Sequence, residues 1–235
     1  EMASQTQAKV RWFSTLGNLS EGDGLYLNGD SAQGCGKYAG SDALPLAHDK
    51  LFGRHNRENA LAAFLAVDGL GIVNGDWHRV LEAYNNFSGL EHRLEWVSEI
   101  KGVRFINDSK ATNDEAAAVA LRALPAPVVL LAGGRSKGGG YDALVEASKD
   151  KVIRVIAFGE AGPEIYERFS SESLETQRCG TMVEAVESSL NGSPKGTTVV
   201  LAPACSSFDE FPTYGVRGRA YKAAVLALGE GKNNE

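Results

Sequence analysis

Several features that mark particular classes of protein are scarce in this sequence. Only three cysteines occur among its 235 residues, Cys35, Cys179 and Cys205, and none forms a CxxC pair. The odd count and wide spacing argue against a disulfide framework or a zinc site, and a reducing cytoplasm fits best. The four histidines also lack metal-ligand spacing, so we expect no metal to be bound by these residues.

Long apolar runs and basic clusters are missing as well. No apolar run approaches the ~20 residues that span a bilayer. The opening segment EMASQTQAK lacks the apolar core of a secretory signal. The formal net charge is -6 without long Lys/Arg runs, which disfavours a nucleic-acid or anionic membrane partner. A local basic cleft for a small anion stays compatible with this charge, and we expect a soluble, cytoplasmic protein.

The glycine-rich segment GGRSKGGG, residues 133–140, fits neither of two well-known nucleotide loops. No Lys-Ser or Lys-Thr follows its glycines at the spacing of a Walker A loop, and the order GxGxxG is absent. The second absence disfavours a nicotinamide-dependent dehydrogenase. Taken alone, the segment is equally compatible with a flexible loop.

The overall composition is typical of a globular protein, with 43% hydrophobic and 23% charged residues. The first fifty residues are broken by glycine, and strands are expected at 9–15 and 24–30, where NGD can close a tight reversal. Apolar periodicity then predicts helices at 54–71 and 76–87, the second with Asp76 as its N-cap. These elements indicate a small α/β unit.

From residue 94 onwards, strands and helices alternate. Apolar, β-branched strands are expected at 94–100, 102–108, 128–132, 152–158 and 198–202, and the first two read as a hairpin that turns at Lys101-Gly102. Helices are expected at 114–124, 141–148, 160–169, 182–190 and 214–228. Strands this apolar must be covered on both faces. The pattern predicts a doubly wound, mostly parallel, Rossmann-like α/β sheet that begins after a boundary near 89–93.

Polar segments follow the expected strands at their carboxyl ends. They are NDSKAT (107–112), GGRSKGGG (133–140), GEAG (159–162) and PACSSFDEF (203–211). In open α/β sheets ligands bind at this edge, so the four segments should converge there. Lys110, Lys137 and Ser207 would then lie beside new helix N-termini, an arrangement that binds anions.

Each of these residues also has a simpler structural interpretation. Thr112 and Glu115 have the spacing of a capping box, T-x-x-E, and Ser109 could also cap a helix. Cys205 lies beside two serines, but it has no evident His or acid partner. A small buried residue is therefore a better interpretation of Cys205 than a nucleophile.

Five segments in order resemble the Mur ligases of peptidoglycan synthesis. They are HNRENALAA (55–63), GLEHRLE (89–95), GVRFINDSKATN (102–113), LLAGGRSKGG (130–139) and APACSSFDEF (202–211), the last followed by Arg217-Gly218. NDSKATN is typical of members that add D-glutamate to UDP-N-acetylmuramoyl-L-alanine, through an acyl phosphate made with ATP and Mg²⁺. The resemblance is strong from about residue 50 and loose before it.

The resemblance implies roles for individual residues. His55, Asn56 and Asn59 would lie at the adenine side of ATP, Arg93 would reach its phosphates, and Asp108 would lie near its ribose. The D-glutamate pocket would comprise Lys110, Thr112, Lys137, Ser207, Phe208 and Tyr214. Arg93 and Lys110 would be the catalytic side chains. Two departures are Tyr214, where phenylalanine is usual, and Ser136, where aspartate is frequent.

Parts of the family pattern are not found in this sequence. A GTNGKT-type phosphate loop and the central domain's Mg²⁺-binding Glu and His do not precede residue 50. The expected organisation is therefore residues 1–92 as the end of a central ATP-binding domain and 93–235 as the C-terminal Rossmann-like domain. Such a chain should be inactive alone and is expected to be a monomer. A non-enzymatic fragment that binds an amino acid or nucleotide and a folylpolyglutamate synthetase-like ligase remain alternatives.

Overall fold

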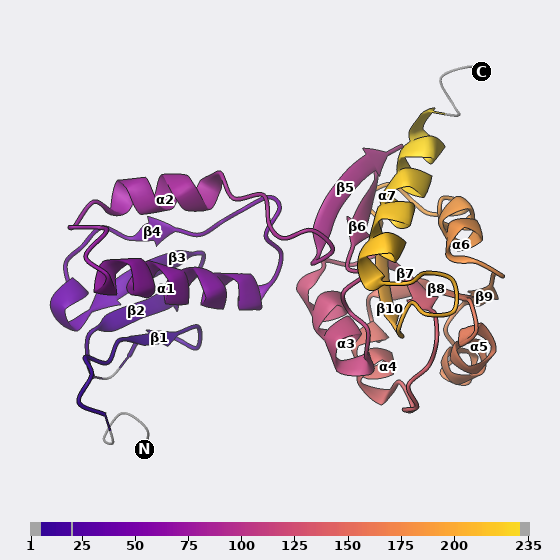
Figure 1. Cartoon of the computed structure of the whole chain (residues 1–235), viewed down its shortest axis with the longest axis horizontal. Coiled ribbons are helices and arrows are strands. Elements are labelled where there is room, and N and C mark those ends of the chain that lie inside the picture. The colour runs from indigo at the N-terminus through magenta and orange to yellow at the C-terminus, as the bar shows by residue number, and fades with distance from the viewer. Residues whose placement is uncertain (1–5, 20, 231–235) are drawn as a thin grey trace. The chain divides into compact units, whose positions relative to one another are not determined.

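The computed structural model describes residues 6–19 and 21–230, and the chain divides into two compact units. The first unit is Glu1–Ser88 and the second is Gly89–Glu235. Figure 1 follows the chain through both units by colour. The division lies at the start of the segment 89–93, close to the boundary expected from the sequence. The assignment of the first unit to an ATP-binding domain stays a prediction.

The first unit contains a small sheet with two helices. The strands, in the spatial order β1-β2-β3-β4, are β1 (Trp12–Ser14), β2 (Gly24–Asn28), β3 (Ser31–Cys35) and β4 (Leu44–Pro45). A 3-10 helix, η2 (Gly36–Tyr38), and the α-helices α1 (Arg54–Gly69) and α2 (Trp77–Asn85) complete it. Leu61, Phe64 and Leu65 of α1 are buried in its core. Apolar periodicity thus placed both helices correctly.

Two local signals in the first unit act as expected. β2 and β3 pair antiparallel, with Asn28 opposite Ser31, so Gly29 and Asp30 close the predicted reversal. Gly29 has a φ of 61°, a left-handed conformation that glycine adopts without strain. Asp76 caps α2 by accepting a hydrogen bond from the backbone N–H of Arg79 at 3.2 Å. Short-range chemistry therefore determines both the turn between β2 and β3 and the beginning of α2.

The second unit contains a six-stranded sheet of order β5-β6-β10-β7-β8-β9. Its strands are β5 (Glu95–Ile100), β6 (Val103–Asn107), β7 (Val128–Gly133), β8 (Val152–Phe158), β9 (Thr176–Arg178) and β10 (Thr198–Ala204). Its helices are α3 (Asp114–Ala123), α4 (Asp142–Ser148), α5 (Gly162–Ser170), α6 (Met182–Ser189) and α7 (Tyr214–Glu230). All neighbouring pairs are parallel except the hairpin of β5 and β6. The mostly parallel sheet and the hairpin are both confirmed.

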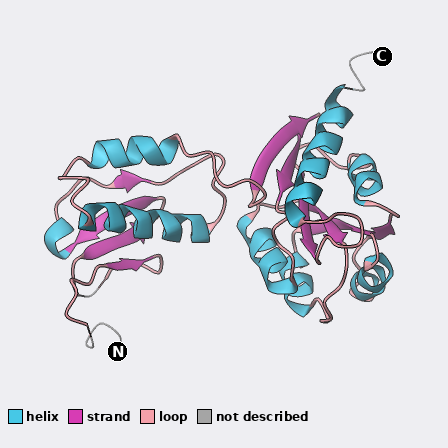
Figure 2. Ribbon diagram, viewed as in Figure 1, coloured by secondary structure: helices cyan, strands magenta, loops and turns pink. Residues whose placement is uncertain are grey.

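Helices cover both faces of this sheet. Residues of α6 and α7 pack on the face that carries Phe105, Leu131 and Phe158, whereas α3, α4 and α5 lie on the other side (Figures 1 and 2). The strand residues between these layers are almost completely buried, and all six residues of β7 are inaccessible. Double coverage explains the near-absence of polar residues in β7 and β10. The short edge strand β9 was not foreseen, because its residues are polar.

The strand order brings three loops to one edge of the sheet. β10 lies between β6 and β7, with Leu201 opposite Asn107 and Ala204 opposite Gly133. Because these strands are parallel, the chain leaves all three at the same edge, called the carboxyl edge below. Among the described residues, no helix is long and apolar enough to cross a membrane.

Candidate functional site

The junction between β6 and α3 is a tight, internally bonded turn. The Asn107 side chain accepts a hydrogen bond from the Ser109 amide at 3.1 Å, and the Ala111 amide donates to the Asp108 carbonyl at 2.9 Å. The Asp108 amide donates to the Leu201 carbonyl of β10 at 2.8 Å. The turn buries Asp108 and Ser109, whereas Lys110 stays partly accessible.

The capping interpretations of this junction are wrong. The N-cap of α3 is Asn113, whose side chain accepts from the Ala116 amide at 2.9 Å, so Thr112 lies outside the helix. The Ser109 hydroxyl instead donates to the Tyr214 carbonyl at 2.8 Å. Asparagine competes well for the N-cap position, and one residue of shift removes the T-x-x-E register. Thr112 therefore does not cap the N-terminus of α3.

The glycine-rich segment is anchored at both ends. Arg135 and Ser206 form an isolated bridge, in which each backbone N–H donates to the other's carbonyl, at 2.9 and 3.0 Å. At the far end, Arg168 of α5 donates to the Gly140 carbonyl at 3.0 Å. The exposed Lys137 lies between these two anchors. The loop following β7 is thus attached to the loop following β10, which a freely flexible segment would not be.

Arg217 joins all three loops from beneath, and the sequence analysis missed it as a site residue. It is 1% exposed and donates to the Ser109 hydroxyl at 3.1 Å and to the Ser109 carbonyl at 3.0 Å. It also donates to the carbonyls of Cys205, Ser206 and Gly133 at 3.1, 3.1 and 3.4 Å. The only signal in the sequence was the Arg-Gly pair noted after PACSSFDEF.

The Arg217 guanidinium donates to neutral groups, and none of its five acceptors is a carboxylate. Desolvation lowers its pKa to about 10, partly opposed by Cys205, Asp209 and Glu210, so the guanidinium is still cationic at neutral pH. A buried cation directly under the carboxyl edge favours negative charge above it. Cys205, completely buried beside Arg217, contacts the Tyr141 hydroxyl at 3.5 Å. The interpretation of Cys205 as a small buried residue is confirmed.

The residues expected to bind the amino acid lie on the loops of this edge, except Tyr214, which is the first residue of α7. Lys110 and Tyr214 are in direct contact, with 3.0 Å between the ammonium nitrogen and the phenol oxygen. Ser207 is 2% exposed, and Phe208 is 62% exposed. Among residues 6–19 and 21–230, neither Lys110 nor Lys137 forms an ion pair with a carboxylate. The two lysines therefore leave positive charge uncompensated at the carboxyl edge.

Two of the residues expected near the nucleotide also belong to the second unit. Asp108 is 9% exposed, and burial raises the pKa of its carboxyl to about 7, partly opposed by the Leu94 amide and the charge of Arg93. Arg93 itself is exposed. This electrostatic coupling places a free guanidinium near a buried acid at the beginning of the second unit.

The other three residues expected near the nucleotide lie together on α1. His55, Asn56 and Asn59 occupy its first two turns, so positions 55 and 59, and 56 and 59, share a face. The Asn56 side chain donates to the Phe52 carbonyl at 2.8 Å, and Asn59 is exposed. They belong to the first unit, and their roles stay predictions.

One acidic group in the second unit has the composition of a metal site. Potential ligand atoms of Glu91, His92 and Glu95 lie within 4.8 Å of one another. The ammonium of Lys222, however, donates to Glu91 at 2.7 Å and to Glu95 at 2.8 Å. The lysine already supplies the cation that these carboxylates require, so the group does not fit a Mg²⁺ ion.

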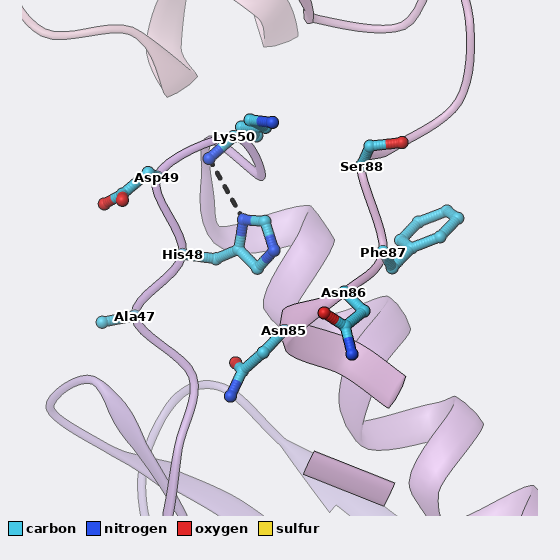
Figure 3. Close-up of a pocket in the computed structure, with 8 residues that line it drawn as sticks. All are labelled: Ala47, His48, Asp49, Lys50, Asn85, Asn86, Phe87 and Ser88. Atoms are coloured by element: carbon cyan, nitrogen blue, oxygen red, sulfur yellow. Dashed lines mark hydrogen bonds between the residues drawn. The ribbon is translucent and has the colours of Figure 1, made fainter. Parts of the chain in front are cut away.

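A pocket of about 310 Å³ lies elsewhere, within the first unit (Figure 3). It is lined by Ala47, His48, Asp49, Lys50, Asn85, Asn86, Phe87 and Ser88. The figure shows the Lys50 amide bonded to the His48 ring, with Asn85 and Asn86 at the end of α2 also lining the pocket. None of the residues predicted for substrate or nucleotide lines this pocket.

Most of the second unit matches a known protein family. Residues 92–205 match the family model described as "Mur ligase, glutamate ligase domain". The match begins at His92 and ends at Cys205, so it includes the β6–α3 junction and the glycine-rich loop. Residues 92–205 belong to the Mur ligase family. Two of the loops at the carboxyl edge are therefore part of a Mur ligase glutamate ligase domain, and Ser207, Tyr214 and Arg217 follow the matched residues.

Curated Mur ligases extend this likeness beyond the domain. The chain is 44% identical over 176 residues to the UDP-N-acetylmuramoylalanine--D-glutamate ligase of Chlorobium limicola, covering 75% of this chain and 37% of that protein. It is 36% identical over 230 residues to the ligase of the same name from Latilactobacillus sakei, covering 97% and 49%. The chain thus spans about half, or less, of the length of these relatives.

Solved structures support the same fold. UDP-N-acetylmuramate-alanine ligase from Thermotoga maritima matches with a TM-score of 0.62 at 18% identity, covering 86% of this chain and 43% of that one. E. coli FolC in complex with ADP matches with a TM-score of 0.58 at 16% identity, covering 90% and 47%. The Mur ligase fold of this chain is therefore shared with enzymes of different substrates.

Proposed function

We propose that this chain is the amino-acid-binding part of an ATP-dependent ligase that adds D-glutamate to UDP-N-acetylmuramoyl-L-alanine. The names of relatives at 36–44% identity support the reaction. The observation that carries the proposal is structural. Lys110 and Lys137 belong to loops that Arg217 and the Arg135–Ser206 bridge join, and neither lysine has a carboxylate partner among the described residues.

A dianionic amino acid has the chemistry that this edge requires. D-glutamate carries two carboxylates, and each accepts several charge-assisted hydrogen bonds. Lys110 and Lys137 supply the cations, and Thr112 and Ser207 supply hydroxyl donors. Ser207 is nearly buried, with 2% of its surface exposed. The exposed Phe208 would cover the methylene groups of the substrate.

Five residues are proposed to contact the nucleotide. His55, Asn56 and Asn59 would contact the adenine side of ATP, Arg93 the phosphates, and Asp108 the ribose. ATP with Mg²⁺ supplies the phosphoryl group that activates the substrate carboxylate as an acyl phosphate. Because Lys222 already occupies the Glu91–His92–Glu95 group, we assign no metal ligand among the described residues.

The contribution of this chain to the reaction is positioning. The amine of D-glutamate attacks the acyl carbon, the C–N bond forms, and the C–O bond to phosphate breaks as the amine loses a proton. Lys110 and Lys137 would fix the substrate carboxylates so that the amine points at the acyl carbon. Orienting two bound reactants is worth roughly 7–11 kcal/mol of barrier, so a domain without a nucleophile still contributes strongly.

The test is binding of D-glutamate by the chain, measured by isothermal titration calorimetry. Lys137→Ala should weaken D-glutamate binding at least about tenfold, the size of one charge-assisted hydrogen bond, and leave ATP binding unchanged. Lys149→Ala is the matched control, because Lys149 is also exposed and pairs only with Glu146. Equal losses for both ligands, or no D-glutamate binding by the unaltered chain, would refute the proposal.

An assay of phosphate release tests whether the chain catalyses the reaction by itself. No GxxxxGK[ST] segment occurs in the sequence, so we expect no phosphate release with ATP, D-glutamate and UDP-N-acetylmuramoyl-L-alanine. Release above background would show that the chain is catalytic by itself. A panel containing L-glutamate and a folate tests the sister-ligase alternative, which preference for L-glutamate would support.

A further inference from the structure

Lys110 and Tyr214 form a pair of hydrogen-bond donors at the carboxyl edge. The Lys110 ammonium lies 3.0 Å from the Tyr214 oxygen and 4.3 Å from the centre of the ring. Because the nitrogen is closer to the oxygen than to the ring centre, the hydroxyl is its main partner and accepts a hydrogen bond. A phenol that accepts one hydrogen bond can still donate its own proton, and the ammonium keeps two further N–H donors.

The backbone under this pair is fixed by buried groups. Tyr214 is the first residue of α7, and its carbonyl accepts from the Ser109 hydroxyl at 2.8 Å. Ser109 is completely buried and is itself held by Arg217. The Lys110 amide donates to the His92 carbonyl at 3.2 Å. The two side chains thus start from backbone positions that are ordered before a ligand arrives.

The Tyr214 ring is also oriented by its neighbour. The His92 ring meets it edge to face, with 6.1 Å between the ring centres, and His92 is 4% exposed. Tyr214 keeps 37% of its surface accessible. His92 and Lys110 each contact the Tyr214 side chain. The part of the phenol that stays accessible is available to a ligand.

The electrostatics of the pair select an anionic ligand. No acidic side chain within the described parts of the chain pairs with Lys110, and the nearby buried Arg217 adds positive charge. A carboxylate has two oxygens, which suit an N–H donor and an O–H donor held side by side. A neutral amide would meet the same donors without the charge-assisted gain.

We propose that the Tyr214 hydroxyl and the Lys110 ammonium bind one carboxylate of the incoming amino acid together, the phenol as proton donor. The inference rests on the proposed function, because it takes an acidic amino acid as the substrate. The Tyr214 hydroxyl then helps to determine substrate specificity, in addition to any contact that the Tyr214 ring makes with the substrate. The competing possibility is that the phenol merely occupies Lys110 and must release it.

Tyr214→Phe tests this in the full chain, because it removes one oxygen and retains the ring contacts. By calorimetry, D-glutamate binding should weaken roughly tenfold, the value of one hydrogen bond to a charged group. Tyr166→Phe is the control, since Tyr166 is equally exposed, at 39%, and lies on α5. Circular dichroism should show the same folded content for both variants.

Analogues identify the carboxylate that is bound. D-glutamine and the α-amide of D-glutamate each lack one of the two carboxylates. For one of the two, the unaltered chain and Tyr214→Phe should bind with equal affinity, because that analogue lacks the group that the hydroxyl contacts. A tenfold loss for both analogues would overturn the proposal.

The outcomes separate the two proposals. If the unaltered chain binds D-glutamate and Tyr214→Phe binds it equally well or more tightly, the hydroxyl only occupies Lys110 and this inference fails alone. If the unaltered chain does not bind D-glutamate, the proposed function fails and this inference fails with it.

Discussion

Asp108 illustrates how burial changes the chemistry of a single residue. Its neighbours Ser109 and Asn107 are completely inaccessible, and its own carboxyl is desolvated enough to raise its pKa to about 7. Arg93 opposes this shift only partly. The carboxyl is therefore poised to be neutral or charged near physiological pH, according to what binds beside it.

The Asp108 shift makes a pH-dependent stability prediction. The folded-state pKa lies above 3.8, the ordinary pKa of an aspartate carboxyl, so the stabilising contribution is full below about pH 4 and is lost as pH rises through about 7. Asp108→Asn imitates the neutral form. Its free energy of unfolding relative to the unaltered chain should rise over this interval, by about 4 kcal/mol at most. Urea titrations at several pH values measure this, and a pH-independent difference would contradict it.

Arg217 is the residue whose loss should be most damaging. Arg217→Met leaves five acceptors without their donor, and we expect a loss of about 3 kcal/mol or more in the free energy of unfolding of the second unit. Arg217→Lys should retain more stability than Arg217→Met but less than the unaltered chain. An ammonium group cannot replace a planar guanidinium with five N–H donors. Denaturant unfolding provides the measurement.

The control lies on the same helix. Arg219 is exposed and belongs to the turn that carries Arg217, so Arg219→Met should change the unfolding free energy by less than about 0.5 kcal/mol. Similar losses for both variants would mean that Arg217 acts through general helix stability.

At the scale of elements, α7 is both a core helix and a support for the site. Tyr221 and Val225 are completely buried against the sheet, whereas Arg217 and Tyr214 face the loops at its beginning. Gly218 allows the close approach of His92, because an added Cβ would lie 2.3 Å from the His92 ring. Glycine at position 218 of α7 therefore permits a contact with His92 that a side chain would block.

Two glycines of α7 provide a matched pair. Gly218→Ala should displace His92 and destabilise the second unit by about 1–3 kcal/mol, through overpacking. Gly229→Ala meets nothing closer than 3.8 Å and should stabilise the helix by about 0.5–1 kcal/mol. Thermal unfolding followed by circular dichroism should therefore show shifts of opposite sign. Two upward shifts in melting temperature would show that helix propensity alone decides.

At the scale of the molecule, the chain consists of two units with cores of different size. The second contains a six-stranded sheet whose central strands are fully buried, and the first contains a four-stranded sheet with short strands. Smaller cores bury a lower fraction of their surface and are less stable. The relatives extend to about twice this length.

This difference predicts two unfolding steps. The first unit should unfold at lower urea concentration than the second, and limited proteolysis should cleave near Ser88-Gly89. Tryptophan fluorescence distinguishes the units, because Trp12 and Trp77 report the first and Trp96 reports the second. Single-tryptophan variants that retain Trp12 or Trp77 should share one midpoint, and the variant that retains Trp96 should unfold at a higher urea concentration. Coincident midpoints would show that the units unfold cooperatively.

The sequence by itself was sufficient for five of the six strands in the sheet of the second unit and for the candidate loops. Double coverage requires apolar strands, turn chemistry marks their ends, and parallel strands bring Lys110, Lys137 and Ser207 to one edge. Strand β9 was missed because an edge strand need not be apolar, and Thr112 was misread because Asn113 competes for the same cap.

Only the tertiary structure could reveal what holds these loops together. Arg217 is separated from Ser109 by 108 positions and from Gly133 by 84, so no local pattern predicts their hydrogen bonds. The same holds for Lys110 and Tyr214, which are 104 positions apart. Local periodicity records which face of an element is buried. Which polar groups meet depends on strand order and on the desolvation of distant side chains, and these exist only in the folded chain.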